Sequence, residues 1–282
     1  MPTSPSSSVQ AARTAVASRL CDIRLNAGIT GRELAVRCGW SESKSSRIEN
    51  GKTPPADADI RAWCTACGAD GRITDLIAAN RNADSMYVEW RRLQRTGLRH
   101  LQESSVPLYR ATRRFRAYCS NVVPGFLQTS GYAAALLSSI AAFRHTPNDV
   151  SEAVASRLAR SQIIYEPDHS FALLIEESVL HYQIGDPGVM AGQLGHLLAV
   201  MSLPSVSLGI IPFGRRRNMW AVEMFTMFDE SRVHVELLSA AVTVTAPGEI
   251  SDYQKAFGEF SKHAVYGASA RSLITSAVDS LG

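Results

Sequence analysis

Apolar residues near the N-terminus repeat with the spacing of an amphipathic helix. They fall at i, i+4, i+7 and i+11: Val16, Leu20, Ile23 and Ala27. This spacing places them on one face of a helix over Val9–Ala27. Gly28 follows directly, and glycine is common where helices end. The sequence therefore predicts a first helix with a single buried stripe.

A capping box at Thr30 and Glu33 marks the start of a second helix. The Thr30 side chain can accept a hydrogen bond from the Glu33 amide, while the Glu33 carboxylate reaches back to the Thr30 amide. The inner face of this helix is apolar, with Leu34, Ala35 and Cys38. Gly39 then breaks it, so a short helix followed by a tight turn is expected.

A third helix is predicted after that turn, because Ser41 is a favourable N-cap and Trp40 can anchor the turn. It ends at Asn50-Gly51, and Ile48 is almost its only apolar residue. Short polar side chains and arginine suit a helix in the major groove, where Arg can bond guanine O6 and N7. An ordinary solvated helix has the same composition. The capped helix and glycine turn before it favour DNA and match helix-turn-helix spacing.

Two more helices complete an all-α, five-helix domain over residues 9–82. Residues 57–67 place Ile60, Trp63, Cys64 and Cys67 on one stripe, and residues 75–81 form the fifth helix. The two cysteines are spaced C-x-x-C, but a zinc site needs a second pair and a redox motif needs a thioredoxin-like context. Both cysteines are therefore expected in the core.

The pattern changes at Asp84, and residues 83–282 predict an α+β domain. A long connecting helix is expected from Met86 to Leu101. Short apolar runs bounded by turn residues predict strands, at 113–119, 171–175, 206–211, 224–228 and 233–237. Helical patterns lie between and after them, at 130–140, 151–164, 189–201, 248–265 and 269–281. The fold class is therefore multidomain, with an all-α domain followed by an α+β domain.

Charge supports a division of labour between these domains. Residues 1–100 hold 15 Lys/Arg and 10 Asp/Glu, whereas the rest of the chain holds 14 and 16. The basic bias of the first part fits a surface that faces DNA. Residues 1–8 are Ser/Pro-rich and lack the features of a signal peptide, which predicts a disordered tail on a cytoplasmic protein. No apolar run approaches the length of a membrane span.

The N-terminal motifs resemble the helix-turn-helix of Xre and phage-repressor regulators. The resemblance rests on Leu25–Thr30, Glu33–Ala35, Gly39–Ser41 and Ser46–Lys52. It implies that base edges are contacted by Glu42, Ser43, Ser46 and Arg47. It implies that phosphates are contacted by Thr30, the Gly31 amide, Lys44, Asn50 and Lys52. It also implies a structural ion pair between Arg24 and Glu49.

This chain departs from the Xre pattern at two positions. Gly31 stands where the family usually has Gln, so one phosphate clamp is lost and the helix N-terminus remains. Ser45 stands where an apolar residue is usual, so looser packing of the third helix is expected. A single helix-turn-helix reads one half-site, so a homodimer on a palindromic double-stranded operator is expected.

The second domain resembles the domain of unknown function that follows the helix-turn-helix in WhiJ-like, antitoxin-like regulators. The resemblance rests on motifs in order: Trp90, Gly97 and Gln102; Val123–Thr129 with Tyr132-Ala133; Gln193-Leu194; Ile211-Pro212; and Val235-Glu236. It implies a small acidic partner protein that the domain senses. It supplies no catalytic residue and no cofactor.

Two basic clusters are candidates for a partner dock: Arg113, Arg114 and Arg116, next to Arg110, and Arg215, Arg216 and Arg217. A solvated edge that discourages strand pairing is the alternative for both. Elsewhere, Glu176-Glu177 is expected to end a strand and begin a helix. His234 and Glu236 are expected to face solvent from one strand.

Three functions remain open. The first is a nucleoid-associated transcriptional regulator whose second domain responds to a partner protein. The second is a regulator that senses a small molecule. The third is an enzyme tethered to DNA, which would need convergent acid, base or nucleophilic groups. The chain contains no G-x-S-x-G, H-E-x-x-H, Walker A or G-x-G-x-x-G motif, so we do not expect an enzyme.

Overall fold

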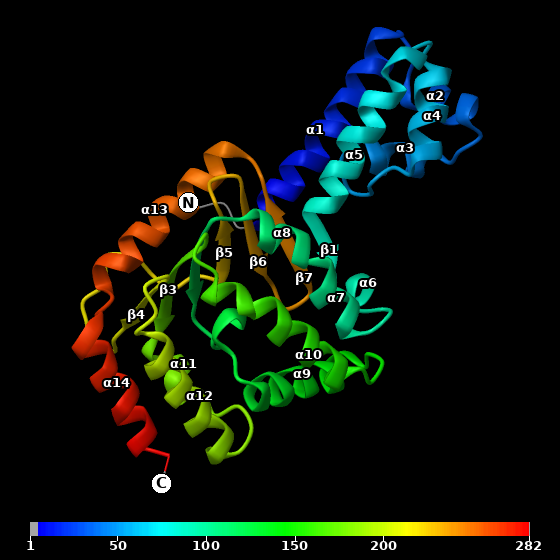
Figure 1. The fold of residues 1–282 in the computed structure, drawn as a ribbon. Helices are drawn as coiled ribbons and strands as arrows, with labels where there is room; N and C mark the ends of the chain where they lie inside the picture. The colour runs from blue at the N-terminus through cyan, green and yellow to red at the C-terminus, as the bar shows by residue number, and fades with distance from the viewer. Residues whose placement is uncertain (1–4, 282) are drawn as a thin grey trace. The chain divides into compact units, whose positions relative to one another are not determined.

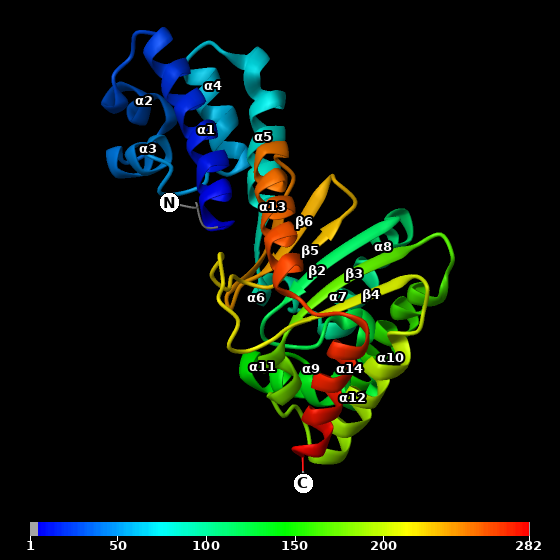
Figure 2. The same ribbon diagram turned by 90° about the vertical axis from the view of Figure 1, so that its left-hand side faces the viewer.

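The computed structural model describes residues 5–281, apart from the side chains of residues 5–11, 81–89 and 91–92. The chain divides into two compact units, the first ending at Val88 and the second beginning at Glu89 (Figures 1 and 2). The boundary therefore lies six residues after the predicted one, because the fifth helix is longer than its apolar pattern indicated.

The first unit contains helices and no internal strand before its last residues. They are α1 (Pro5–Asn26), α2 (Gly31–Cys38), α3 (Glu42–Glu49), α4 (Asp57–Ala66), the short 3-10 helix η1 (Asp70–Arg72) and α5 (Ile73–Met86). Helix α1 begins four residues before the predicted start, so residues 5–8 of the predicted disordered tail are helical. Residues 1–4 of that tail lie outside the described residues.

One hydrophobic core holds these helices together. Its fully buried members include Leu20, Leu34, Ile48, Ile60, Trp63 and Leu76. The buried Trp63 indole N–H donates to the Leu20 carbonyl at 3.0 Å, so the largest core side chain leaves no orphan donor. Cys64 is buried in this core, and Cys67 packs against it, as the sequence predicted. Burial raises the pKa of both thiols.

The predicted long helix from Met86 to Leu101 is wrong. After α5 the chain forms strand β1 (Tyr87–Glu89), then α6 (Trp90–Leu93) and α7 (Leu98–Ser104). Gly97 separates the last two with a φ of 103°, which side chains rarely adopt. The Asp149 carboxylate accepts from the Leu98 and Arg99 amides, both at 2.8 Å, and so caps α7. A Cβ at position 97 would collide with that carboxylate.

A mixed sheet organises the second unit, as expected for an α+β domain. Its remaining strands are β2 (Arg114–Cys119), β3 (Ser170–Glu176), β4 (Val206–Ile211), β5 (Phe225–Phe228), β6 (Arg232–Glu236) and β7 (Ala240–Val244). The order is β1-β7-β6-β5-β2-β3-β4. Strands β2, β3 and β4 pair in parallel, whereas β5, β6 and β7 are antiparallel. Strand β7 was not predicted.

Helices cover both faces of this sheet. They are α8 (Val106–Ala111), α9 (Ser130–Arg144), α10 (Val150–Ser161), α11 (Glu177–His181), α12 (Pro187–Val200), α13 (Pro247–His263) and α14 (Gly267–Asp279), with 3-10 turns η2 (Gly125–Leu127) and η3 (Gln162–Tyr165). The main core lies between the parallel strands and helices that include α9, α12 and α14. On the other face, Phe260 of α13 stacks on Tyr118 at 4.1 Å (Figure 2).

The expected solvent-facing pair on β6 is only half right. Glu236 is exposed, but His234 is half-buried and its ring lies 4.6 Å from that of Phe228. Burial, with a smaller effect of nearby Arg232, lowers the pKa of His234 to about 4. The imidazole is therefore neutral at pH 7, and strand alternation alone did not reveal the neighbouring ring.

Candidate nucleic-acid interface

Local capping signals fix α2, the turn and α3. The capping box is present: the Glu33 amide donates to Thr30 Oγ1 at 3.2 Å, and the Thr30 amide donates to Glu33 Oε2 at 2.7 Å. The two amide interactions with Thr30 lower the pKa of Glu33. Gly39 ends α2 in the left-handed region, and Ser41 accepts from the Lys44 amide at the start of α3. These signals are the ones that the sequence displayed.

Helix α3 presents one polar face to solvent. Ser45 and Ile48 are buried against the domain. The exposed positions fall at i, i+1, i+4 and i+5, which share a face: Glu42, Ser43, Ser46 and Arg47. The buried Ser45 hydroxyl donates to the Glu42 carbonyl at 3.0 Å, so the serine at this usually apolar position is satisfied within the helix.

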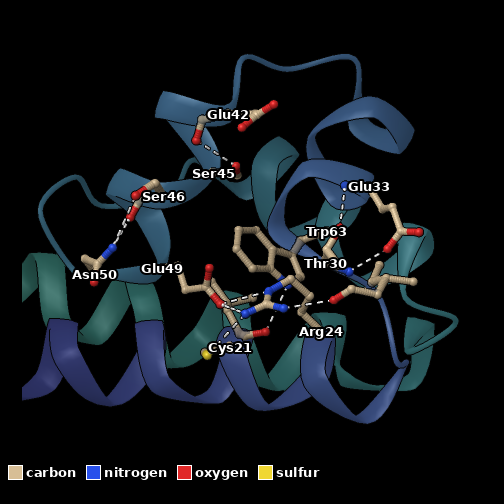
Figure 3. Close-up of polar contacts among 12 residues, drawn as sticks. Cys21, Arg24, Thr30, Glu33, Glu42, Ser45, Ser46, Glu49, Asn50 and Trp63 are labelled. Atoms are coloured by element: carbon tan, nitrogen blue, oxygen red, sulfur yellow. Dashed lines mark hydrogen bonds and ion pairs between the residues drawn. The ribbon is translucent and has the colours of Figure 1, made fainter.

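Arg24 joins α1, α3 and the loop before α2, as Figure 3 shows. Its guanidinium donates to Glu49 Oε1 at 2.5 and 2.9 Å and to the Ile29 carbonyl at 2.8 Å. The two side chains are 13% and 17% exposed, so the pair is mostly shielded from water. The Glu49 carboxylate raises the pKa of Arg24. This pair, which the Xre resemblance implied, holds α3 at a fixed angle to α1.

The residues expected at phosphates have different surroundings. Thr30, Asn50 and Lys52 are exposed, and Gly31 begins α2. Asn50 Nδ2 donates to the Ser46 carbonyl at 2.7 Å, which closes the C-terminus of α3 (Figure 3). Lys44 differs, because its ammonium forms an ion pair with Asp59 of α4 at 2.7 Å.

Lys44 is further held by an aromatic contact. Its ammonium lies 4.4 Å from the ring centroid of Trp40, a cation–π geometry. Sequence reasoning missed Asp59 as its partner, because the two residues come from different helices. It also missed Arg32, which lies 3.5 Å from Glu42 in an ion pair where both side chains are well exposed. Such exposed pairs contribute at most about 1 kcal/mol.

The two basic clusters of the second unit do not form one surface. Arg114 begins β2, while Arg215 and Arg216 follow the end of β4. Since both strands point the same way in the parallel part of the sheet, the clusters lie at opposite ends, about 20 Å apart for six residues. A dock that combines them is therefore excluded for a short contact.

Arg217 serves inside the domain. It forms a two-pronged ion pair with Glu176, whose side chain is 7% exposed, and Tyr118 donates to the same carboxylate at 2.8 Å. The predicted strand end and helix start at Glu176-Glu177 are correct, but Glu176 neutralises an arginine. Arg217 is thus removed from the predicted dock, whereas Arg215 and Arg216 stay exposed.

The first basic cluster is also partly engaged. Asp229 accepts from the Arg113 and Arg114 amides at 3.1 and 2.8 Å, and its carbonyl accepts from Arg116 at 3.0 Å. The Arg114 guanidinium forms an exposed ion pair with Glu230 at 3.2 Å. The cluster therefore fastens β2 to the turn between β5 and β6.

Comparisons with known proteins assign both units. The domain of unknown function DUF5753 matches residues 104–276, more than half of the chain. The chain belongs to this family. A helix-turn-helix domain matches residues 15–76, which contain α2, α3 and α4. This N-terminal helix-turn-helix, followed by the DUF5753 domain, suggests a DNA-binding regulator.

Other comparisons add little. No curated protein matches the chain. The archaeal chromatin protein TrmBL2, whose structure shows a novel mode of DNA binding, aligns with 85% of this chain and 88% of its own. The identity is 9% and the TM-score 0.32, so the likeness carries no argument. Among the described residues, no helix is long and apolar enough to cross a membrane, and no cluster of metal-ligand side chains occurs.

Proposed function

We propose that this protein is a sequence-specific transcriptional regulator of the Xre type, with α3 lying in the major groove of an operator. The observation that carries the proposal is the exposed polar face of α3, namely Glu42, Ser43, Ser46 and Arg47, on a helix that Arg24 and Glu49 hold in place. A rigid scaffold matters because base readout needs side chains within hydrogen-bond reach of base edges.

The proposed phosphate contacts surround this face. Thr30 accepts the Glu33 amide but keeps its hydroxyl hydrogen to donate, and Gly31 begins a helix whose N-terminus favours anions. Asn50 and Lys52 extend the surface at the other end of α3. Lys44 is a weaker candidate, since it would have to leave Asp59 to reach a phosphate.

DNA binding by the full chain is expected to weaken steeply as salt rises. Each neutralised phosphate contributes about −0.9 to the slope of log affinity against log salt. Titration of duplexes selected from a random pool, at several salt concentrations, measures this slope. Arg271→Ala, which removes an exposed charge from α14, is expected to keep it. A flat salt response, or the absence of any selected sequence, would refute the proposal.

We further propose that the DUF5753 domain is regulatory, without catalytic activity, and that the regulator acts as a dimer in the cytoplasm on nucleoid DNA. The resemblance to WhiJ-like, antitoxin-like regulators supports a small acidic partner protein as its effector. Arg215 and Arg216 are the proposed dock, because they remain exposed while Arg217 is paired. A small-molecule effector is the second candidate, favoured by the arginines of α9 and α10 described below.

The proposed dock predicts a salt-sensitive partner. Capture with the full chain is expected to recover a small acidic protein, and the Arg215→Ala, Arg216→Ala double variant is expected to lose it, because like charges steer the encounter. Arg110→Ala, which removes an exposed arginine at the opposite end of the sheet, should capture as well as the parent. Equal capture by both variants moves the dock elsewhere, and recovery of no acidic protein rejects this effector.

A further inference from the structure

Three arginines of the DUF5753 domain are half-buried without an acidic partner at hand. They are Arg144 at the end of α9 and Arg157 and Arg160 of α10. Arg157 donates to the side chains of Gln102 and Gln128, at 3.1 and 2.6 Å, both from buried glutamines. Its guanidinium is thus oriented by neutral amides that leave its charge uncompensated.

The other two arginines lie on aromatic rings. Arg160 is 4.4 Å from the ring centroid of Tyr109, and Arg144 is 4.5 Å from that of Trp90. Arg160 also donates to the Gln102 carbonyl at 3.2 Å, while its buried Nε has no hydrogen-bond partner. Within the part of the chain that the structure describes, no carboxylate lies within ion-pair distance of these guanidinium groups.

Such an arrangement is unfavourable in the absence of an anion. A charged group taken out of water costs free energy unless it is paired. Burial, followed by repulsion from Arg160, lowers the pKa of Arg157 to about 10. Burial also lowers the pKa of Arg144. The charges are therefore held close together with less solvent than surface arginines have.

The neighbouring sheet face is polar where the apolar core ends. Phe115 and Phe228 belong to the core, and Tyr109 packs against both rings. Further along the same face of β5, β6 and β7 the side chains are polar or small and at least partly exposed: Thr226, His234, Glu236, Ala241 and Thr243. Glu236 is the acidic group that raises the pKa of Arg144 and Arg157, although it forms no ion pair with them.

We propose that Arg144, Arg157 and Arg160 form a binding site for a small anionic ligand that carries a carboxylate or phosphate group. Guanidinium forks bind both groups with two parallel hydrogen bonds, and the glutamines preorganise the Arg157 fork. Trp90 and Tyr109 hold the other two cations. Glu236 opposes the anion and tunes its affinity. An effect of the ligand on DNA binding would rest on the proposed function; the binding step itself does not.

Calorimetric titration and thermal melts of the full chain with sodium phosphate and with sodium succinate test the site, against sodium chloride at equal ionic strength. Saturable binding of either anion is expected, and which one binds identifies the ligand group. Arg157→Gln is expected to weaken binding roughly tenfold or more, because a charge-assisted pair is lost. Arg271→Gln, which removes one exposed charge from α14, is expected to bind like the parent.

Glu236→Gln separates a ligand site from a structural role of the arginines. This exposed substitution leaves the fold intact and removes the repelling charge, so tighter anion binding is expected. Arg157→Lys keeps the charge without the fork and should bind more weakly than the parent; it also replaces Arg157→Gln if that variant does not fold. Equal responses to phosphate, succinate and chloride, or equal affinities of Glu236→Gln and the parent, would overturn the site. Neither result depends on DNA binding.

Discussion

Arg24→Ala is expected to destabilise the helix-turn-helix unit by about 2–4 kcal/mol. The substitution leaves the Glu49 carboxylate, 17% exposed, without its cation, and frees the Ile29 carbonyl that Arg24 also binds. Calorimetric unfolding of the full chain measures the loss.

Lys52→Ala serves as the matched control, because Lys52 is exposed and its loss should change the free energy of unfolding by no more than about 0.5 kcal/mol. Equal unfolding free energies for the two variants would show that the ion pair contributes no net stability. A double variant with Glu49→Ala should recover part of the loss, since it removes the stranded carboxylate.

Arg47→Ala is expected to weaken binding to the selected operator by about 1–3 kcal/mol and to relax base preference at one position. Arg47 is exposed on the outer face of α3, and no hydrogen bond or ion pair of its side chain occurs among the described residues. Competition titrations with operators that vary at each position measure both effects.

Lys52→Ala is the comparison variant here too, with the opposite signature. A phosphate contact carries no sequence information, so its loss should weaken binding to specific and random DNA alike and reduce the salt slope by about one. Equal losses on specific and random DNA for Arg47→Ala would contradict its assignment to a base edge. Lys44 is unsuitable for this comparison, because its substitution also breaks the pair with Asp59.

The elements of the first unit were predictable where local chemistry determines them. The capping box at Thr30, the left-handed Gly39 and the Ser41 cap each act within a few residues, so the sequence displays them directly. The Arg24–Glu49 pair spans 25 positions and was expected only through the family resemblance. The pair of Lys44 with Asp59 joins two helices and had no such guide.

Prediction failed where helix spacing was misleading or a strand was short. Met86 and Trp90 are four residues apart, as on one helix face, yet β1 separates them. Strand β7 alternates only alanine, valine and threonine over five residues, too few to distinguish it from a loop. The arginines of α9 and α10 escaped notice because their glutamine and aromatic neighbours come from separate helices and loops.

The pair between Arg217 and Glu176 has a consequence for a chain that is cut. Residues 212–224 contain no helix or strand, and besides that pair they are held by the Phe213 amide, which donates to Glu177. Strand β5 on the far side of this stretch pairs with β2 on the near side, and α14 packs into the main core. A protease that nicked the arginine run would therefore leave two fragments interlocked through one sheet, so the severed polypeptide keeps its folded architecture.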